Sequence, residues 1–313
     1  MRILMTGGAG TLGSNLIDRY LPQGHEILVI DNFATGNKGN VPPMDGLQVI
    51  EGSVADKDLV DQAFASFKPE LVINSAAAYK DPSDWQEDTA TNVTGSIYVA
   101  KAALEHGVKR LINFQTALAY GRPDVVPIPV THPNRPFTSY GISKLAGENF
   151  LMMSGLDVVS LRLANITGPR LAIGPIPTFY QRLKAGKGCF CSETVRDFLD
   201  LEDFLVLMDK VIDFDAPTGV FNVSTGEGKS IKDVFDAVVS YLGIELAEEV
   251  PVVPCGDDDV PAVVLDASET MKAFDWQPQY GFEETIQRVL QWYDRYGVTD
   301  VFSHLSKPIG HED

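Results

Sequence analysis

The stretch Met5-Thr6-Gly7-Gly8-Ala9-Gly10-Thr11-Leu12-Gly13 follows a short apolar run that begins at Ile3, and it precedes an amphipathic segment that extends to Leu21. This order predicts a strand, a glycine-rich turn and a helix. Such a turn presents backbone N–H groups at the N-terminus of the helix, where a pyrophosphate can bind. Glycine-rich turns are common, so the glycines alone are a weak indication of a ligand.

A second strand-like run, His25 to Ile30, ends at Asp31. An acid about 20 residues after the glycines suits the ribose hydroxyls of an adenosine and repels a 2′-phosphate, which favours NAD over NADP. The alternative is a tight turn without a ligand. Turn and acid together make that alternative the weaker interpretation.

Composition and charge exclude several classes of protein. The 313 residues carry a formal net charge of −18, which argues against nucleic acid or an anionic membrane as a partner. No stretch is long and apolar enough to span a bilayer, so we expect a cytoplasmic protein. The three cysteines, Cys189, Cys191 and Cys255, fit a reducing compartment. A second Cys/His pair near Cys189 and Cys191 is missing, so we expect buried thiols there and no metal site.

Strand-like and helical patterns alternate along the first half of the chain. The strand-like runs are Arg2–Met5, Glu26–Ile30, Leu47–Ile50, Leu71–Asn74, Arg110–Phe114 and Val158–Leu163. Helical patterns between them include Asp56–Phe67, Asp84–Glu105 and Ser139–Met153. This alternation predicts a parallel sheet covered on both faces, a Rossmann-type doubly wound α/β fold. Ligands bind such sheets beyond the carboxyl ends of the strands.

After Leu163 the pattern loosens into a smaller C-terminal α/β substrate lobe. We expect Val220–Val223 to return to the main sheet, the acidic turn 256–259 to be exposed, and the tail from Ser303 to be exposed as well. The predicted division is a dinucleotide-binding domain in residues 1–165 with a return of 197–223, and a substrate lobe in 166–196 and 224–313. Further helices are expected at Thr178–Lys184, Leu201–Ile212, Ser230–Leu242 and Phe282–Tyr296.

Tyr140 and Lys144 form a Tyr-x-x-x-Lys pair, one turn apart on the same face of the predicted helix 139–153. A phenol with a pKa of about 10 is a poor base at neutral pH, but a nearby ammonium favours its phenolate. Thr116 follows the predicted strand Arg110–Phe114, where its hydroxyl would face a substrate oxygen. We therefore predict Thr116, Tyr140 and Lys144 as catalytic residues. The alternatives are a solvated helix face and a threonine that completes a strand end.

Eight segments, in this order and at this spacing, resemble the extended short-chain dehydrogenases/reductases, specifically the NAD-dependent nucleotide-sugar epimerase/dehydratase family. The similarity covers nearly the whole chain and is greatest to bacterial UDP-sugar 4-epimerases that serve surface polysaccharide such as O-antigen. The matching segments are Thr6–Gly13, Asp31-Asn32-Phe33, Asn74-Ser75-Ala76-Ala77, Asn92-Val93-Thr94-Gly95, Thr116–Gly121, Tyr140–Lys144, Arg162–Pro169 and Arg196-Asp197-Phe198.

The resemblance implies NAD as the cofactor and a nucleotide-activated sugar as the substrate. The residues implied for NAD are Gly7, Gly10, Thr11, Leu12, Asp31, Asn32, Phe33, Ser53, Val54, Ala76, Ala77, Asn92, Tyr140, Lys144 and Ala164. The residues expected at the substrate are Tyr79, Lys80, Thr116, Asn165 and Arg196.

Each substrate residue has a plainer interpretation. Asn165 and Arg196 fall where the family contacts the nucleotide diphosphate, but a loop cap and an ion pair with Asp197 are the alternatives. Lys80, at the mouth of the sugar pocket beside Tyr79, can pair with a uronate carboxylate or stay solvated.

The residues after Thr116 distinguish between reactions. Related sugar 4,6-dehydratases carry an Asp-Glu pair there, whereas this chain has Ala117 and Leu118, which cannot move a proton. The resemblance therefore implies an epimerase that transiently oxidises the 4-hydroxyl and returns the hydride. The alternatives are a reductase, decarboxylase or dehydratase of the same fold, or a non-catalytic NAD-binding module. Relatives pair through two helices, so we expect a homodimer through Asp84–Glu105 and Ser139–Met153.

The chain departs from the family at two binding positions. Ser53 replaces an aspartate that hydrogen-bonds adenine in many relatives, and Cys255 and Gly256 occupy the region of a second arginine on the diphosphate. The possible replacements for that arginine are Arg170, Arg182 and Lys184. We expect His132, in the proline-rich loop 122–136, to be a surface residue.

Overall fold

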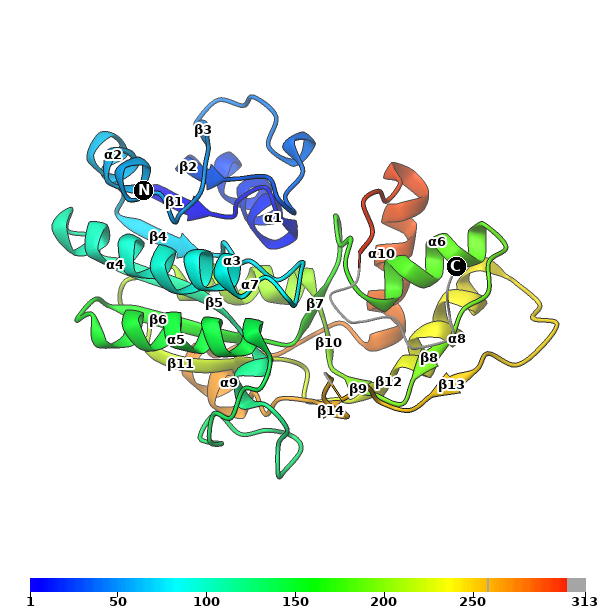
Figure 1. Cartoon of the computed structure of the whole chain (residues 1–313). Coiled ribbons are helices and arrows are strands. Elements are labelled where there is room, and N and C mark those ends of the chain that lie inside the picture. The colour runs from blue at the N-terminus through cyan, green and yellow to red at the C-terminus, as the bar shows by residue number, and fades with distance from the viewer. Residues whose placement is uncertain (258, 303–313) are drawn as a thin grey trace.

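The computed structural model describes residues 1–257 and 259–302. Its larger lobe contains a seven-stranded sheet in the order β11-β6-β5-β4-β1-β2-β3, and every neighbouring pair is parallel. β1 runs from the N-terminus toward the second lobe, so the carboxyl ends of the strands face that lobe (Figure 1). The predicted Rossmann-type fold is confirmed. The strands are β1 (Arg2–Thr6), β2 (Glu26–Asp31), β3 (Leu47–Glu51), β4 (Leu71–Asn74), β5 (Arg110–Thr116), β6 (Val158–Leu163) and β11 (Gly219–Val223).

Helices cover both faces of this sheet because its central strands are apolar on both sides. In β1, Ile3 and Met5 pack into one cluster of buried side chains, and Leu4, between them, packs into the other. The first cluster lies under α1 and α7, and the second lies under α2, α4 and the end of α5. These helices are α1 (Thr11–Tyr20), α2 (Lys57–Phe67), α4 (Ser96–Glu105), α5 (Ser139–Met153) and α7 (Leu201–Val211). Short helical turns lie at η1 (Leu21–Gln23), η2 (Lys38–Asn40) and η4 (Ala117–Tyr120).

The segment from residue 84 to residue 105 is helical as predicted, but its middle is wider than an α-helix. α3 (Trp85–Asp88) leads into a π-helical segment, η3 (Thr89–Gly95), before α4 begins. Gly95 allows this segment to approach the loop after β3, since a Cβ there would lie 2.5 Å from a methyl carbon of Val54. Wide turns inside helices often mark functional sites.

The second lobe has a core of its own, in which Phe179, Phe235 and Ile286 come from different helices. From this lobe the chain returns to the large sheet at β11, where Gly219 lies opposite Val159 of β6. Its helices are α6 (Pro175–Lys184), α8 (Ile231–Leu242) and α10 (Phe282–Tyr296), whereas α9 (Ser268–Phe274) lies beside β11 of the large sheet (Figure 1). The short strands of the second lobe are β7 (Asn165–Thr167), β8 (Cys191–Ser192), β9 (Val195–Arg196), β10 (Phe198–Asp200), β12 (Lys229–Ser230), β13 (Val252–Val253) and β14 (Ala262–Val263).

The lobes share more of the chain than the predicted division into domains implies. α9 belongs to the predicted substrate lobe, yet its Phe274 packs against Phe221 of β11, with ring centroids 4.9 Å apart. The domain boundaries therefore stay a prediction. The tail predicted to be exposed, from Ser303, lies outside the described residues.

Within residues 1–257 and 259–302, no helix combines the length and hydropathy needed to cross a membrane. The three cysteines are thiols; Cys191 is buried, and Cys189 and Cys255 are half-buried.

Candidate active site

At two positions of the glycine turn between β1 and α1, a side chain would collide with backbone atoms. Gly7 has a φ of +68°, and a Cβ there would lie 2.8 Å from the Cα of Ala76, just after β4. A Cβ on Gly13 would lie 2.6 Å from the Cα of Gly8. Gly10, the N-cap of α1, is less crowded, and the nearest described atom to a Cβ there is the Gly7 carbonyl oxygen at 3.4 Å. The start of α1 is therefore open to a ligand such as a pyrophosphate.

Asp31 ends β2 beside this turn. Its Oδ2 accepts the N–H of Ala9 and its Oδ1 accepts the N–H of Phe33, both at 2.8 Å. Burial raises the pKa of this carboxyl, and the two N–H donors lower it. The carboxylate holds the glycine turn against β2 and retains lone pairs for a further donor such as a ribose hydroxyl. The Asn32 side chain accepts the N–H of Ala34 at 3.0 Å and shapes the next turn.

The backbone after β4 is fixed against the same turn. The Thr6 hydroxyl accepts the N–H groups of Ser75 and Ala76, each at 3.1 Å. This contact places Ala76 and Ala77 beside Gly7. In α1, the Thr11 hydroxyl donates to the carbonyl of Arg170 at 3.0 Å. The start of α1 is thus also tied to the chain that enters the second lobe.

Two other residues predicted to contact NAD act on the loops around the cleft. The Asn92 amide accepts from the N–H of Ala78 and donates to its carbonyl, both at 2.9 Å. It also donates to the Ser143 hydroxyl at 3.0 Å and is buried. Ser53 accepts the N–H of Ala55 at 3.1 Å. The Asn92 side chain therefore positions the loop after β4, and its contact with NAD stays a prediction.

The three predicted catalytic residues come together at the carboxyl end of β5. Thr116 ends this strand, Tyr140 lies in the first turn of α5, and the two side chains interact. Lys144 is buried one turn further along, and its Nζ donates to the carbonyl of Phe114 at 2.6 Å. Gln115, which sequence reasoning missed, donates to the Lys144 carbonyl at 2.9 Å and accepts the Thr116 N–H at 2.7 Å. This buried amide ties β5 to α5.

The pKa of the Tyr140 phenol is not lowered on balance by its surroundings, in contrast to the prediction from the sequence. Burial raises the pKa of Tyr140 above its usual value, Tyr79 and Asp88 raise it further, and the Thr116 side chain lowers it. Burial lowers the pKa of the Lys144 ammonium to about 8. The ammonium donates to a main-chain carbonyl, so the expected lowering of the phenol pKa does not come from a direct contact. The protein alone therefore holds the phenol protonated.

Tyr79 links the catalytic end of the cleft to the loop after β2. Its ring centroid lies 5.8 Å from that of Tyr140, and its hydroxyl interacts with the Thr35 side chain. Phe302 packs on Tyr79 with centroids 5.9 Å apart. The Nζ of Lys80, an exposed residue, lies 5.9 Å from the centroid of the Phe302 ring. Tyr79 and Lys80 thus lie near Tyr140, with Lys80 at the outer rim.

Arg196 forms its ion pair with Asp259, and not with Asp197, the alternative suggested by the sequence. Its Nη2 lies 2.6 Å from Oδ1 of Asp259, and its Nη1 donates to two backbone carbonyls at 2.8 Å. Asp197 instead caps the turn that begins at Thr225, because successive side chains of a strand point to opposite faces. Asp259 is only 8% exposed, so the expectation of an exposed acidic turn at 256–259 is wrong for this residue. Burial lowers the pKa of Arg196, and Asp259 raises it.

Asn165 lies exposed on β7, and its amide donates to the Asp197 carbonyl at 3.1 Å, as in the loop-cap interpretation. Ala164, just before it, donates its N–H to the Val223 carbonyl at 2.9 Å. Cys255 is close enough to affect the pKa of Arg196, so it lies in the region of the missing second arginine.

The cations considered as replacements have partners of their own. Arg170 pairs with Asp18 at 2.7 Å, and Lys184 pairs with Asp294 at 3.0 Å. Arg182 donates to the carbonyl of Gly188 at 2.7 Å. None of these contacts brings the three cations to Arg196.

His132 is buried, so its assignment as a surface residue is wrong. It is 7% exposed, and its ring lies edge-on to Tyr120, with centroids 5.9 Å apart. Its Nε2 accepts the N–H of Asp124 at 3.2 Å. The imidazole thus closes the loop 122–136 on itself.

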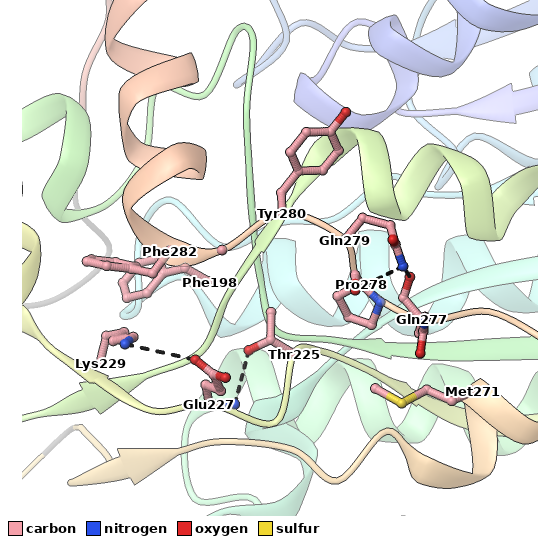
Figure 2. A pocket seen from close by; sticks show the side chains of 11 residues that line it. Phe198, Thr225, Glu227, Lys229, Met271, Gln277, Pro278, Gln279, Tyr280 and Phe282 are labelled. Atoms are coloured by element: carbon pink, nitrogen blue, oxygen red, sulfur yellow. Dashed lines mark hydrogen bonds and ion pairs between the residues drawn. The ribbon is translucent and has the colours of Figure 1, made fainter.

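A cavity of about 330 Å³ lies elsewhere, between β10, β12 and the stretch 277–282 that leads into α10. Figure 2 shows Glu227 between Lys229, 3.9 Å away, and Thr225, whose hydroxyl accepts the Glu227 N–H at 3.0 Å. Among the described residues that line this cavity, none is a predicted site residue. Its size therefore does not identify the active site.

Comparison with known proteins agrees with the cleft described above. The sequence matches the NAD dependent epimerase/dehydratase family over residues 3–224. The chain belongs to this family. The enzyme WbmG of Bordetella bronchiseptica, solved with NAD and UDP, is 69% identical with a TM-score of 0.94, covering 98% of this chain and 99% of that chain. WbmH of the same organism, solved with NAD⁺, is 38% identical with a TM-score of 0.90, covering 95% and 99%. A UDP-glucose 4-epimerase of Corynebacterium glutamicum is 30% identical over 317 residues, covering 91% of this chain and 93% of that protein.

The cleft of this family member fits a dinucleotide on structural grounds. A Cβ at Gly7 or Gly13 would collide with backbone, so the turn packs against Ala76 and closes on Gly8 only with glycine at these two positions. Asp31 lies at the end of the neighbouring strand with lone pairs to spare. Tyr140 lies at the other end, joined to the loop after β2 through Tyr79. In dinucleotide-binding folds of this kind, the start of the helix after the glycine turn binds the pyrophosphate, and the acid that ends the next strand bonds the ribose.

Proposed function

We propose that this chain is an NAD-dependent UDP-sugar 4-epimerase. The observation that carries the proposal is the pairing of Thr116 with Tyr140 beside a buried lysine, in a cleft that fits a dinucleotide. The two residues after Thr116, Ala117 and Leu118, carry no acid or base, which disfavours dehydration. The similarity to WbmG, solved with NAD and UDP, and to UDP-glucose 4-epimerases supports the same assignment.

In this proposal the side chains move one proton and hold one sugar. Tyr140 accepts the proton of the 4-hydroxyl, and Thr116 bonds the same oxygen and assists the transfer. Lys144 anchors α5 to β5 and supplies positive charge near the phenol. Bound NAD⁺ supplies the hydride acceptor and donor, and its positive ring favours the phenolate. The pocket must let the oxidised sugar rotate, so that the hydride returns to the opposite face of its ring and the 4-hydroxyl forms again with inverted configuration.

The nucleotide end of the substrate lies in the second lobe. Arg196 and Asn165 face the diphosphate, and Arg196 exchanges part of its pairing with Asp259 for phosphate oxygens, which suit its planar fork. Tyr79 and Lys80 border the sugar, where Lys80 pairs with a negative group when the sugar carries one. The proposed division is an NAD-binding domain of residues 1–165 with the return of 197–223, and a substrate lobe in the remainder.

The functional form in this proposal is a homodimer. Several apolar side chains are exposed on α3, α4 and α5, among them Trp85 at 70%, Ile142 at 51% and Met153 at 75%. Large apolar side chains exposed on neighbouring helices support an interface there, and the same two helical segments from each subunit would form a four-helix contact. Thiols at all three cysteines suit a cytoplasmic enzyme. In this proposal the enzyme supplies sugars for surface polysaccharide, as the sequence resemblance implies.

The decisive experiment compares the wild type with Tyr140→Phe on a panel of UDP-, dTDP-, GDP- and CDP-sugars, with products identified by NMR. The wild type should interconvert a UDP-sugar and its 4-epimer without net formation of NADH. Tyr140→Phe should retain its NAD but lose turnover, and Tyr98→Phe, a half-buried tyrosine on α4, serves as the control. Stoichiometric NADH formation by the wild type would instead identify an oxidative decarboxylase, and stoichiometric consumption of added NADH would identify a reductase.

A further inference from the structure

A buried carboxylate that the proposed mechanism does not use lies next to the catalytic helix. Asp88, the last residue of α3, is 2% exposed. Its side chain hydrogen-bonds the side chain of Ser139, the first residue of α5. Its Oδ2 finds no hydrogen-bond partner among the described residues. A buried carboxylate oxygen without a donor is costly, so the position calls for an explanation.

The position of Asp88 is set by close packing between parallel helical segments. Contacts repeat at steps of four residues. Asp88 bonds Ser139, and Asn92 bonds Ser143 at 3.0 Å. One step further, a Cβ on Gly147 would lie 2.2 Å from the carbonyl oxygen of Asn92. These contacts fix α3 and η3 against α5, so Asp88 is held beside the turn that carries the catalytic phenol.

The surroundings of Asp88 contain no described cation that compensates its charge. Burial raises the pKa of Asp88 above its usual value, the Ser139 side chain lowers it, and the charges of Asp81, Asp84 and Glu87 raise it further. From α5 it faces the Ser139 hydroxyl and the Tyr140 phenol, and the N-terminal end of α5 favours a negative charge there. A neutral side chain could make the contact with Ser139 at less cost, so the contact does not by itself account for a carboxylate.

We propose that Asp88 is a positioning residue for the Tyr140 phenol. The negative charge of Asp88 keeps the phenol protonated until a positively charged ligand binds in the cleft. The inference rests on the proposed function, in which Tyr140 is the base. Tyr79 and Thr116 also act on the phenol and are uncharged at neutral pH. The Lys144 ammonium, one turn along the same helix, donates to the Phe114 carbonyl. Because of the charge on Asp88, the phenol loses its proton only when a ligand occupies the cleft.

The test is Asp88→Asn, which keeps the shape and removes the charge. Tyrosine labelled with carbon-13 reports the ionisation of Tyr140 by NMR, with the signal assigned by its absence in Tyr140→Phe. In Asp88→Asn we expect the Tyr140 titration, and the low-pH limb of kcat/KM, to shift down by about half to one pH unit. The KM for the UDP-sugar should stay within about twofold, because Asp88 is buried against α5 and asparagine keeps its shape.

The matched control is Glu87→Gln, which removes an exposed charge from the same helix. Glu87 disfavours the ionised form of Asp88, so its removal should lower neither titration. Ser139→Ala is the second variant if Asp88→Asn does not fold. Loss of the hydrogen bond makes the carboxylate easier to protonate, so the same shift should occur but be smaller. An unshifted phenol in a folded Asp88→Asn or Ser139→Ala, or an equal shift in Glu87→Gln, overturns the inference. A shifted phenol in an enzyme that epimerises no sugar overturns the proposed function instead.

Discussion

Replacing Gly13 with alanine separates the packing of the glycine turn from its ligand chemistry. The added Cβ would lie 2.6 Å from the Cα of Gly8 and 2.9 Å from the carbonyl oxygen of Gly7. Both are backbone atoms, which cannot rotate away as a flexible side chain can. Overpacking of this kind costs about 1–3 kcal/mol, and alanine recovers about 1 kcal/mol of helix propensity relative to glycine. Because the contact is at the severe end, we expect a net loss of about 1–2 kcal/mol in the free energy of unfolding.

Gly10→Ala is the matched control from the same turn. Its Cβ would meet ordinary contact at 3.4 Å, and the φ at this N-cap is −74°, which alanine adopts readily. Stability should change by less than about 1 kcal/mol, because this N-cap has no side-chain hydrogen bond to lose. The methyl group would, however, stand where the pyrophosphate approaches the start of α1, so NAD affinity should fall.

The assay is thermal unfolding of NAD-free protein by calorimetry, together with NAD titration by isothermal calorimetry. Gly13→Ala should lower Tm by about 3–6 °C, and Gly10→Ala should leave Tm nearly unchanged while weakening NAD binding. The reasoning is refuted if Gly10→Ala destabilises the NAD-free protein as much as Gly13→Ala, or if Gly13→Ala unfolds like the wild type.

Three further outcomes are expected. Arg110 donates to Asp157 at 2.7 Å and to several main-chain carbonyls, and Arg110→Met leaves them all without their donor. Urea unfolding should therefore show a loss of about 3–5 kcal/mol in the free energy of unfolding. The control is Arg135→Met, which removes an exposed ion pair and should cost less than about 1 kcal/mol. Lys144 has a pKa of about 8 in the folded protein against an ordinary value of 10.5, so the unfolded chain binds more protons between these values. Wild-type stability should therefore rise by about 1–2 kcal/mol from pH 8 to pH 9.5 relative to Lys144→Met, and parallel pH profiles would contradict this. Ile142→Asp should convert the dimer to a monomer in sedimentation velocity, and an unchanged sedimentation coefficient would place the interface elsewhere.

Features that depend on neighbours in the sequence could be predicted from the order of the amino acids alone. The glycine turn, Asp31 and the alternating strands and helices follow from local backbone preference and apolar periodicity, which operate over a few residues. The spacing of Tyr140 and Lys144 places both on one helix face for the same reason. The site residues at the ends of parallel strands then had to meet at one edge of the sheet.

Contacts between distant segments came only from the tertiary structure. The partner of Arg196 is Asp259, 63 residues away, and not the adjacent Asp197, because strand geometry turns neighbouring side chains to opposite faces. His132 is buried because its loop folds against Tyr120, and Asp88 is buried because α3 packs on α5. Burial and charge at a side chain depend on what the rest of the chain brings to it, so the pKa of Tyr140 and its control by Asp88 are properties of the packed molecule alone.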